Sequence, residues 1–332
     1  MSSIVLPNFS ARDAAITQRP TSTAILAIDS EDRFQDYTDE RRTLPPGTIN
    51  RSPYDFTIQK DEPLLNGAFT RIGVNEIVFP WLVPNINRKT NQIRVVSLNG
   101  GVPDARTITL TEAFYTPADL AAALQLAIRA IPGMGAFTLT YGVNLANQAL
   151  PVFVYATNNP AAFISFEPMA ANSSTYPFGT SSKQLFDMLG FSDANTVLTN
   201  LPGVGKMTLC QAIRYIDIVS TQLTANQAVR DSMSQPISRT ILARLYVNGA
   251  PGEQSTVKCS APEFCPAGCA PTTIYRDYSQ AKQIQWMPNC PVGGYLRFEV
   301  FDDSGDNLIN SFSFYPGADN ANWSMTLLAT EN

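Results

Sequence analysis

The chain has 332 residues, of which 44% are hydrophobic, and this is enough apolar material for a sizeable core. Only 15% are charged, below the roughly 25% typical of soluble domains, and the net charge of −5 argues against a nucleic-acid binder, which needs a basic surface. The chain contains no histidine, so it lacks the commonest general base and the commonest metal ligand. These numbers favour a scaffold or interaction protein over an enzyme.

Neither a membrane span nor a secretory signal is indicated. No segment approaches the roughly 18 consecutive apolar residues that a membrane-spanning helix needs. Residues 1–7 have no basic region followed by a long apolar region, as a signal peptide would. We therefore expect a protein that is made in the cytoplasm and does not cross a membrane.

The first hundred residues predict an arm followed by β-strands. Residues 1–22 are polar and aperiodic, and we expect them to form an extended N-terminal arm. The charged, turn-rich stretch 36–52 predicts a surface connection. Apolar residues in β-type patterns predict strands at Thr23–Ile28, Tyr54–Ile58, Arg71–Pro84 and Gln92–Leu98.

A helix is predicted just after residue 116. Thr116 suits the N-cap, Pro117 the first helical position, and Asp119 the positive end of the helix dipole. Apolar residues recur at helical spacing over 120–128, and Pro132-Gly133 ends the pattern.

The segment that contains this helix differs from the rest of the chain. A second short helix is predicted at Ser182–Leu189, ended by Gly190. Short strands are predicted at Phe137–Tyr141, Leu150–Tyr155 and Phe163–Phe166. We expect residues 111–205, approximately, to form an α+β insertion within an all-β framework.

The β pattern resumes after residue 209 and continues to the end of the sequence. Asp302–Asn307 separates two apolar runs, Tyr295–Phe301 and Leu308–Phe314, and predicts a hairpin. The predicted strands are Arg214–Leu223, Ile241–Val247, Ala281–Trp286, Tyr295–Phe301, Leu308–Phe314 and Trp323–Leu328. Many short strands between turn residues indicate a β-sandwich or barrel.

The cysteines form the one chemical cluster in the sequence. Cys259, Cys265 and Cys269 lie in a Pro-rich stretch, and Cys290 follows. Four thiolates can hold a structural zinc, although only Cys265 and Cys269 have the close spacing that such sites favour. Disulfides, which form in oxidising surroundings, and free thiols are the other two states compatible with this pattern.

Other motifs give weaker signals. Asp302, Asp303 and Asp306 do not have the spacing of a calcium-binding EF-hand loop. Gly203-Val-Gly-Lys206 lacks the spacing of a phosphate-binding P-loop. A nucleophile with a histidine partner cannot be formed, but a carboxylate pair of the glycosidase type stays open as an alternative. Tyrosines that can serve either a sugar-binding surface or packing are Tyr115, Tyr141, Tyr176 and Tyr315.

Several short motifs, taken in order, resemble one protein family. Ala27-Ile-Asp-Ser-Glu-Asp-Arg33, Ser52-Pro-Tyr-Asp-Phe-Thr-Ile58 and the strand 71–84 resemble the opening of penton or minor capsid proteins of double-stranded DNA viruses. These are the virophages, the polinton-like viruses and the nucleocytoplasmic large DNA viruses. Motifs that are similar to later parts of the family pattern are Phe114–Leu120, Leu185–Phe191, Tyr215–Ser220, Leu223-Thr224, Ile284–Pro288 and Phe298–Asp302.

This resemblance implies a fold and a role. It implies a single jelly-roll β-sandwich over residues 23–332, interrupted by the α+β insertion and preceded by the arm. It also implies a structural protein of the virion capsid, synthesised in the host cytoplasm, that forms a homopentamer at icosahedral five-fold vertices. The expected partners are the surrounding major capsid protein and other minor capsid or vertex fibre proteins, with no cofactor and no catalytic residue. A minor cement protein between or beneath capsomers, and a receptor- or glycan-binding jelly roll, are the alternatives.

Overall fold

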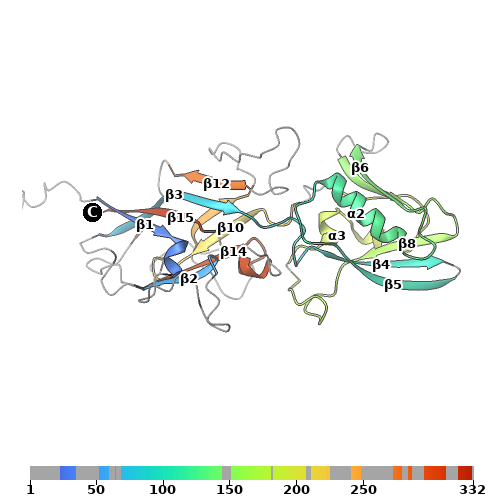
Figure 1. Ribbon diagram of the computed structural model, residues 1–332, viewed down its shortest axis with the longest axis horizontal. Coiled ribbons are helices and arrows are strands. Elements are labelled where there is room, and N and C mark those ends of the chain that lie inside the picture. Colours follow the sequence, from blue (N-terminus) through green and yellow to red (C-terminus); the bar gives the residue numbers. More distant parts are fainter. Residues whose placement is uncertain are drawn as a thin grey trace, which may run out of the picture.

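The described part of the chain forms two lobes that lie side by side along the long axis of the molecule (Figure 1). The computed structural model describes residues 23–34, 52–59, 64, 69–99, 101–143, 151–180, 182–206, 211–224, 241–247, 272–278, 283–285, 295–311 and 321–330. The expected N-terminal arm, residues 1–22, lies outside these ranges. Strands dominate both lobes, so the predicted all-β class is confirmed.

The first lobe consists of two antiparallel sheets. One sheet has the order β1 (Thr23–Asp29), β15 (Ser324–Thr330), β3 (Arg71–Trp81) and β12 (Thr272–Asp277), with β13 (Gln283–Gln285) pairing to the other end of β3. The second sheet has the order β11 (Ile241–Tyr246), β10 (Tyr215–Val219), β14 (Tyr295–Asp302) and β2 (Asp55–Gln59). A 3₁₀ turn, η1 (Ser30–Phe34), follows β1 and contacts β2.

The strand order of this lobe is that of a jelly roll. We count β12 and β13 as one interrupted strand and number the eight described strands of this lobe in chain order. The first sheet then has the order 1-8-3-6 and the second has the order 5-4-7-2. This interleaving of early and late strands is the double Greek key of a single jelly roll, which confirms the predicted fold. We call the described residues within 23–81 and 215–330 the jelly-roll lobe.

Alternating side chains from both sheets form the core of the jelly-roll lobe. Along β14 and β15 every second residue is buried, as expected for strands with one face on a core. Trp323 lies at the centre, with its ring centroid 5.6 Å from that of Phe56 and 6.1 Å from that of Phe298. Its indole N–H donates to the backbone carbonyl of Pro53 at 2.6 Å, so the one polar atom of the buried ring is satisfied.

The second lobe is inserted between β3 and β10, and we call it the insert lobe. Its first sheet has the order β5 (Val102–Thr109), β4 (Gln92–Asn99) and β8 (Ala162–Glu167). Its second sheet has the order β6 (Thr138–Val143), β7 (Pro151–Ala156) and β9 (Gly203–Val204). The insert lobe also contains two helices, α2 (Pro117–Arg129) and α3 (Leu185–Met188), and a 3₁₀ turn, η2 (Asp193–Thr196). Another 3₁₀ turn, η3 (Leu308–Ser311), lies in the jelly-roll lobe.

The insert lobe begins earlier in the chain than the sequence predicts. The sequence predicts Gln92–Leu98 as a framework strand and the insertion at 111–205. In the structure, β4 pairs with β8 over six residue pairs, from Arg94↔Glu167 to Asn99↔Ala162. β5 pairs with β4 in turn. Both strands therefore lie in the insert lobe, and we propose a division of the chain in which the insertion begins soon after β3.

Helix α2 forms where its local signals predict it. The Thr116 hydroxyl accepts a hydrogen bond from the backbone N–H of Asp119 at 3.2 Å, and Pro117 stands in the first turn. Leu120, Leu124 and Ile128 are buried, so the apolar stripe faces the core of the insert lobe. The second predicted helix is shorter than expected and covers only Leu185–Met188.

The predicted hairpin at the end of β14 is wrong in its second half. Residues Leu308–Ser311 form the 3₁₀ helix η3, and among the described residues only an isolated bridge between Phe301 and Asn307 remains of the expected pairing. The cause is local, because the Asp302 carboxylate accepts the backbone N–H groups of Ser304 and Asp306 at 3.0 Å each. These bonds turn the chain tightly instead of leading it back along β14.

Both ends of the described chain lie far from the insert lobe. Thr23 at the start of β1 pairs with Thr330 at the end of β15. Figure 1 shows this pair of strands running to the end of the jelly-roll lobe that is opposite to the insert lobe. The molecule therefore has two unlike ends, one with the termini of the described chain and one formed by the insert lobe.

Candidate functional site at the junction of the two lobes

A buried polar turn leads from β3 into the insert lobe. The Asn87 side chain donates to the backbone carbonyl of Pro84 at 3.0 Å and accepts the backbone N–H of Lys89 at 2.9 Å. The Thr90 hydroxyl accepts the backbone N–H of Asn87 at 2.9 Å and donates to the carbonyl of Asn85 at 2.7 Å. These bonds fix the backbone on both sides of Lys89, and so they fix the position of that side chain.

Lys89 joins this turn to the jelly-roll lobe. Its ammonium nitrogen lies 2.5 Å from Oδ2 of Asp302 and 2.7 Å from Oδ2 of Asp306. Lys89 and Asp302 are 4% and 1% exposed, whereas Asp306 reaches solvent on one side. A buried ammonium needs charged partners with good geometry, because its desolvation is costly, and the end of β14 supplies two.

The two carboxylates belong to the tight turn that ends β14. Besides Lys89, Asp302 accepts two backbone N–H groups, so its charge is shared among several donors. Gly305 adopts a φ of +88°, which glycine tolerates best. Burial raises the pKa of the Asp302 carboxyl above its ordinary value, and the nearby Lys89 ammonium opposes this increase only in part.

Two further contacts tie the insert lobe to the same cluster. The Ser182 hydroxyl donates to Oδ2 of Asp306 at 3.0 Å. The hydroxyl of Tyr176, which is fully buried, donates to the backbone carbonyl of Lys89 at 2.9 Å. The segment before α3, the turn before β4 and the turn after β14 therefore meet at one point.

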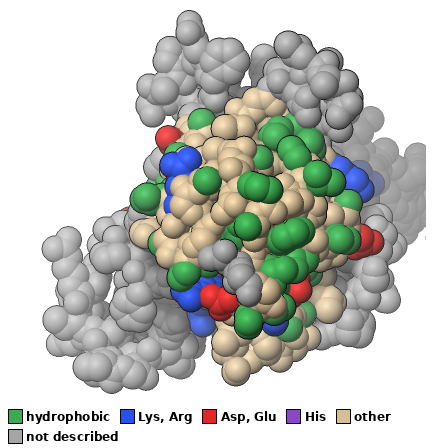
Figure 2. Space-filling view, turned by 90° about the vertical axis from the view of Figure 1, so that its right-hand side faces the viewer, with side chains coloured by type: hydrophobic (Ala, Val, Ile, Leu, Met, Phe, Trp, Pro, Cys, Tyr) green, Lys and Arg blue, Asp and Glu red, His purple; other side chains and the backbone are tan. Residues whose placement is uncertain are grey.

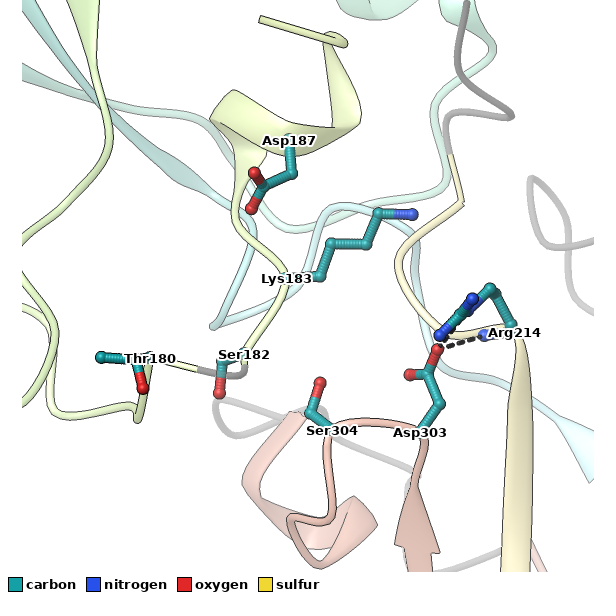
Figure 3. A pocket seen from close by; sticks show the side chains of 7 residues that line it. All are labelled: Thr180, Ser182, Lys183, Asp187, Arg214, Asp303 and Ser304. Carbon is teal, nitrogen blue, oxygen red and sulfur yellow. Dashed lines mark hydrogen bonds and ion pairs between the residues drawn. The ribbon is translucent and has the colours of Figure 1, made fainter. Parts of the chain in front are cut away.

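A polar pocket of about 340 Å³ lies beside this cluster, where the two lobes meet (Figure 3). Asp303 accepts hydrogen bonds from Arg214 through the guanidinium at 2.8 Å and the backbone N–H at 3.4 Å. The Lys183 ammonium donates to the backbone carbonyl of Gln211. The lining residues are Thr180, Ser182, Lys183, Asp187, Arg214, Asp303 and Ser304.

The charged groups of the pocket are engaged in contacts that hold backbone segments together. Asp187 caps α3 by accepting the backbone N–H of Gln184 at 2.9 Å, and Asp303 is bound to Arg214. Lys183 and Arg214 balance these two carboxylates, so the lining carries no excess of either charge. The arrangement suits a fixed connection between lobes better than a site for an anion or a cation.

The residues predicted as a thiol cluster cannot be compared with this site. Cys259, Cys265, Cys269 and Cys290 all lie outside the described residues. Within the described ranges, no group of three or more Cys, Asp or Glu side chains is arranged to hold a metal ion. The acidic turn considered for calcium is instead occupied by the Lys89 ammonium, which contacts Asp302 and Asp306.

Two other sequence motifs have packing roles. Gly203, in the motif that weakly resembles a P-loop, lies in β9, and a Cβ atom there would stand 2.0 Å from the Tyr155 ring. Of the tyrosines considered for a sugar surface, Tyr176 is buried, and Tyr115 and Tyr141 pack partly against the core. Tyr315 lies outside the described residues.

A second cluster that the sequence did not reveal connects the two sheets along one side of the jelly roll. Arg244 on β11 forms a bidentate pair with Asp217, at 2.7 and 2.8 Å, and stacks 4.0 Å from the Tyr215 ring centroid. On the neighbouring sheet, Arg276 and Tyr278 both donate to the backbone carbonyl of Arg244. Only the alternation of Tyr and Arg with apolar residues along these strands could have indicated it.

The comparisons with known proteins add a similarity to a solved structure. No family model matches the sequence, and no curated protein matches it. Among solved structures, the chain is similar to the mavirus penton protein, known from a crystal structure of its selenomethionine-labelled form, with a TM-score of 0.48 and 11% sequence identity. The match covers 93% of this chain and 99% of that one. No helix among the described residues is both long and apolar enough to cross a membrane.

Proposed function

We propose that this chain is a structural protein of a viral capsid, and that five copies form a closed ring at each icosahedral five-fold vertex. In this role the ring contacts the major capsid protein around it, and the chain acts by assembly, not by catalysis. The observation that carries the proposal is the complete single jelly roll with one large insertion between β3 and β10.

The fold alone does not define the function, because jelly rolls occur in viral capsids, lectins and cupins. A metal site built on histidine, the commonest metal ligand, cannot form here because the chain has no histidine. The charged fraction of 15% is low for a protein surrounded by water but suits one that meets neighbours over much of its surface. These two features favour the capsid role.

A ring needs two unlike surfaces on each copy, because every copy contacts the next one in the same direction. The jelly roll offers such a pair. One side has the outer strands β1 and β2, and the other has β11 and β12 with the Tyr and Arg cluster. Tyr246 and Tyr275 on that second side are each 38% exposed, and Tyr and Arg are enriched in protein interfaces. In such a ring all insert lobes lie on one rim, and Thr23 and Thr330, the ends of the described chain, lie on the other.

Native mass spectrometry of the purified full-length chain tests the ring. We expect a mass of five copies, and we expect Tyr246→Glu, on the β11 side, to shift the mass towards one copy. Leu126→Glu serves as the matched control, because Leu126 is 74% exposed on α2 in the insert lobe, away from both proposed contact sides. A mass of one copy at every concentration contradicts the ring and favours a minor capsid protein seated between capsomers.

A further inference from the structure

A lysine and two aspartates are in contact where the insert lobe meets the jelly-roll lobe. The nitrogen of Lys89 lies 2.5 Å from Oδ2 of Asp302 and 2.7 Å from Oδ2 of Asp306, and Lys89 and Asp302 are almost completely buried. By contrast, Figure 2 shows the outer end of the insert lobe, where few of the described side chains are charged. An amine held against a carboxyl group and shielded from water is a contact between two groups that can react with each other.

The two side-chain oxygens of Asp302 have different surroundings. Oδ2 contacts the Lys89 nitrogen, whereas Oδ1 accepts the backbone N–H groups of Ser304 and Asp306 at 3.0 Å each. Two backbone N–H groups on one oxygen form an oxyanion hole, which stabilises the negative charge that develops there when a nucleophile adds to the carbon. The backbone N–H of Asp302 donates to the carbonyl of Asp306 at 2.9 Å, so the turn holds these donors in place. The carboxyl carbon of Asp302 is therefore prepared for attack by an amine.

Asp306 has the position of a general acid and base. Its Oδ2 contacts the Lys89 nitrogen and accepts the hydroxyl proton of Ser182 at 3.0 Å, which fixes the carboxylate beside the reacting atoms. A carboxylate at this point can accept a proton from the nitrogen and deliver it to the nearby Oδ2 of Asp302. Asp306 is 34% exposed, so its open side gives water formed at Oδ2 a way out.

We propose that Lys89 and Asp302 condense to an intramolecular isopeptide bond after the chain has folded. A proton first moves from the ammonium to the Asp302 carboxylate, which gives a neutral amine and a carboxylic acid. Nζ then bonds to Cγ with the negative charge on Oδ1, and Asp306 transfers one proton from Nζ to the Oδ2 hydroxyl. The Cγ–Oδ2 bond breaks, the double bond re-forms at Oδ1, one water leaves, and a neutral amide remains.

The surroundings of the pair favour this step. Burial raises the pKa of the Asp302 carboxyl, which favours the protonated form that an amine can attack. The fixed contact makes the reaction intramolecular, and a site closed to water opposes hydrolysis of the amide. Because an ammonium holds its proton strongly at neutral pH, the step is slow, and freshly folded protein contains the ion pair.

The bond would link the insert lobe covalently to the end of β14. It closes a loop between two residues that are 213 positions apart in the sequence. A cross-link of this length stabilises the folded state, because it restricts the unfolded chain. This inference goes beyond the proposed capsid role and does not depend on it.

Peptide mapping of the purified full-length chain tests the inference. Folded protein is incubated, denatured and digested, and mass spectrometry measures a peptide pair that is joined through Lys89 and Asp302. This pair is lighter than the sum of its two peptides by one water, about 18 Da. We expect its fraction to rise with incubation time and to stay at least about tenfold lower in protein kept unfolded in urea. Lys89→Met removes the nucleophile and should abolish the joined pair.

A second variant tests the proton transfer while both bonded residues remain. Asp306→Asn keeps the size of the side chain but removes the carboxylate, so we expect the bond to form about a hundredfold more slowly. Asp303→Asn is the matched control, because Asp303 lies in the same turn but bonds to Arg214. Circular dichroism establishes that both variants are folded before their rates are compared.

Each outcome supports or overturns a part of the inference. If folded wild-type protein yields no joined pair after prolonged incubation, the ion pair is the final state and the inference fails. Loss of water without a joined pair also overturns it, because a cyclic imide at an aspartate gives the same change in mass. Equal rates in Asp306→Asn and Asp303→Asn would show that Asp306 transfers no proton in this reaction.

Discussion

The ammonium nitrogen of Lys89 lies 2.5 Å from Oδ2 of Asp302, although 213 residues separate the two in the sequence. Both side chains are almost completely buried. Lys89 belongs to the turn that opens the insert lobe, and Asp302 ends β14 of the jelly-roll lobe. This pair, with Asp306, therefore holds a large insertion in a defined position on its framework.

Removing the cation should destabilise the protein more than removing one anion. Lys89→Met keeps most of the side-chain volume but leaves Asp302 buried without its partner, so we expect the free energy of unfolding to fall by about 3–5 kcal/mol. Asp302→Asn should cost less, because the contact between Lys89 and Asp306 remains. Urea denaturation followed by circular dichroism measures both changes.

An exposed ion pair provides the control for this experiment. Arg106 and Asp104 on β5 are 2.7 Å apart and about half exposed, so Arg106→Met should change the free energy of unfolding by less than about 1 kcal/mol. Equal effects of Lys89→Met and Arg106→Met would show that the junction does not depend on the buried cation.

The burial of Asp302 also predicts a pH dependence. Because burial raises its pKa in the folded protein, the folded state holds this proton more tightly than the unfolded state. The resulting stabilisation is fully present below the pKa of the unfolded state and is lost as the pH rises through the raised pKa. Relative to Asp302→Asn, the wild type should therefore become less stable as the pH rises above the ordinary pKa of an aspartic acid, about 4.

Denaturant titrations of both proteins across this pH range measure the difference, and other titrating groups cancel in the comparison. A difference that stays constant with pH would mean that Asp302 has the same pKa in the folded and unfolded chain. A difference of the opposite sign would mean that Lys89 outweighs burial.

Local features of the fold could be predicted from the sequence because their causes are local. The hydroxyl of Thr116 caps a helix whose first turn begins one residue later, so cap, turn and apolar stripe are all contained in a few residues. The alternation of buried residues along β14 is likewise visible in the strand itself.

The junction could not be predicted in this way. Lys89 stands in an ordinary polar turn, and Asp302–Asn307 has the composition of a common hairpin loop. Nothing in either segment indicates that they meet, because that contact depends on how β3 and β14 are placed in the folded lobe. For the same reason, the sequence pattern of β4 predicts a strand of the framework, although β4 pairs with β8 of the insert lobe.

Gly203 is predicted to be essential for packing in the insert lobe. A Cβ atom at this position would lie 2.0 Å from Tyr155, whose ring is buried and lies 4.9 Å from that of Phe166. Tyr155 has little room to move, so Gly203→Ala should lower the free energy of unfolding by about 1–3 kcal/mol. Gly142→Ala in β6 is the matched control, because a Cβ atom there meets nothing within 4 Å and should have little effect.

Thermal unfolding of the two alanine variants distinguishes these cases. If Gly203→Ala melts at the wild-type temperature, the contact between β9 and Tyr155 does not limit stability. A decrease for Gly142→Ala that equals that of Gly203→Ala would show that loss of glycine in either strand is harmful for reasons other than the contact with Tyr155.

Trp323 should contribute most to the contact between the two jelly-roll sheets. It comes just before β15 in one sheet and packs on Phe56 and Phe298 of the other, and its ring is 1% exposed. Trp323→Ala leaves a large cavity and an unpaired carbonyl at Pro53, so we expect a loss of about 3–5 kcal/mol in the free energy of unfolding. Tyr295→Ala on β14 removes a ring that is 54% exposed and should cost about 0.5 kcal/mol or less. Chemical denaturation of both variants tests this, and similar losses would mean that the aromatic cluster between the sheets is not the main source of stability in this lobe.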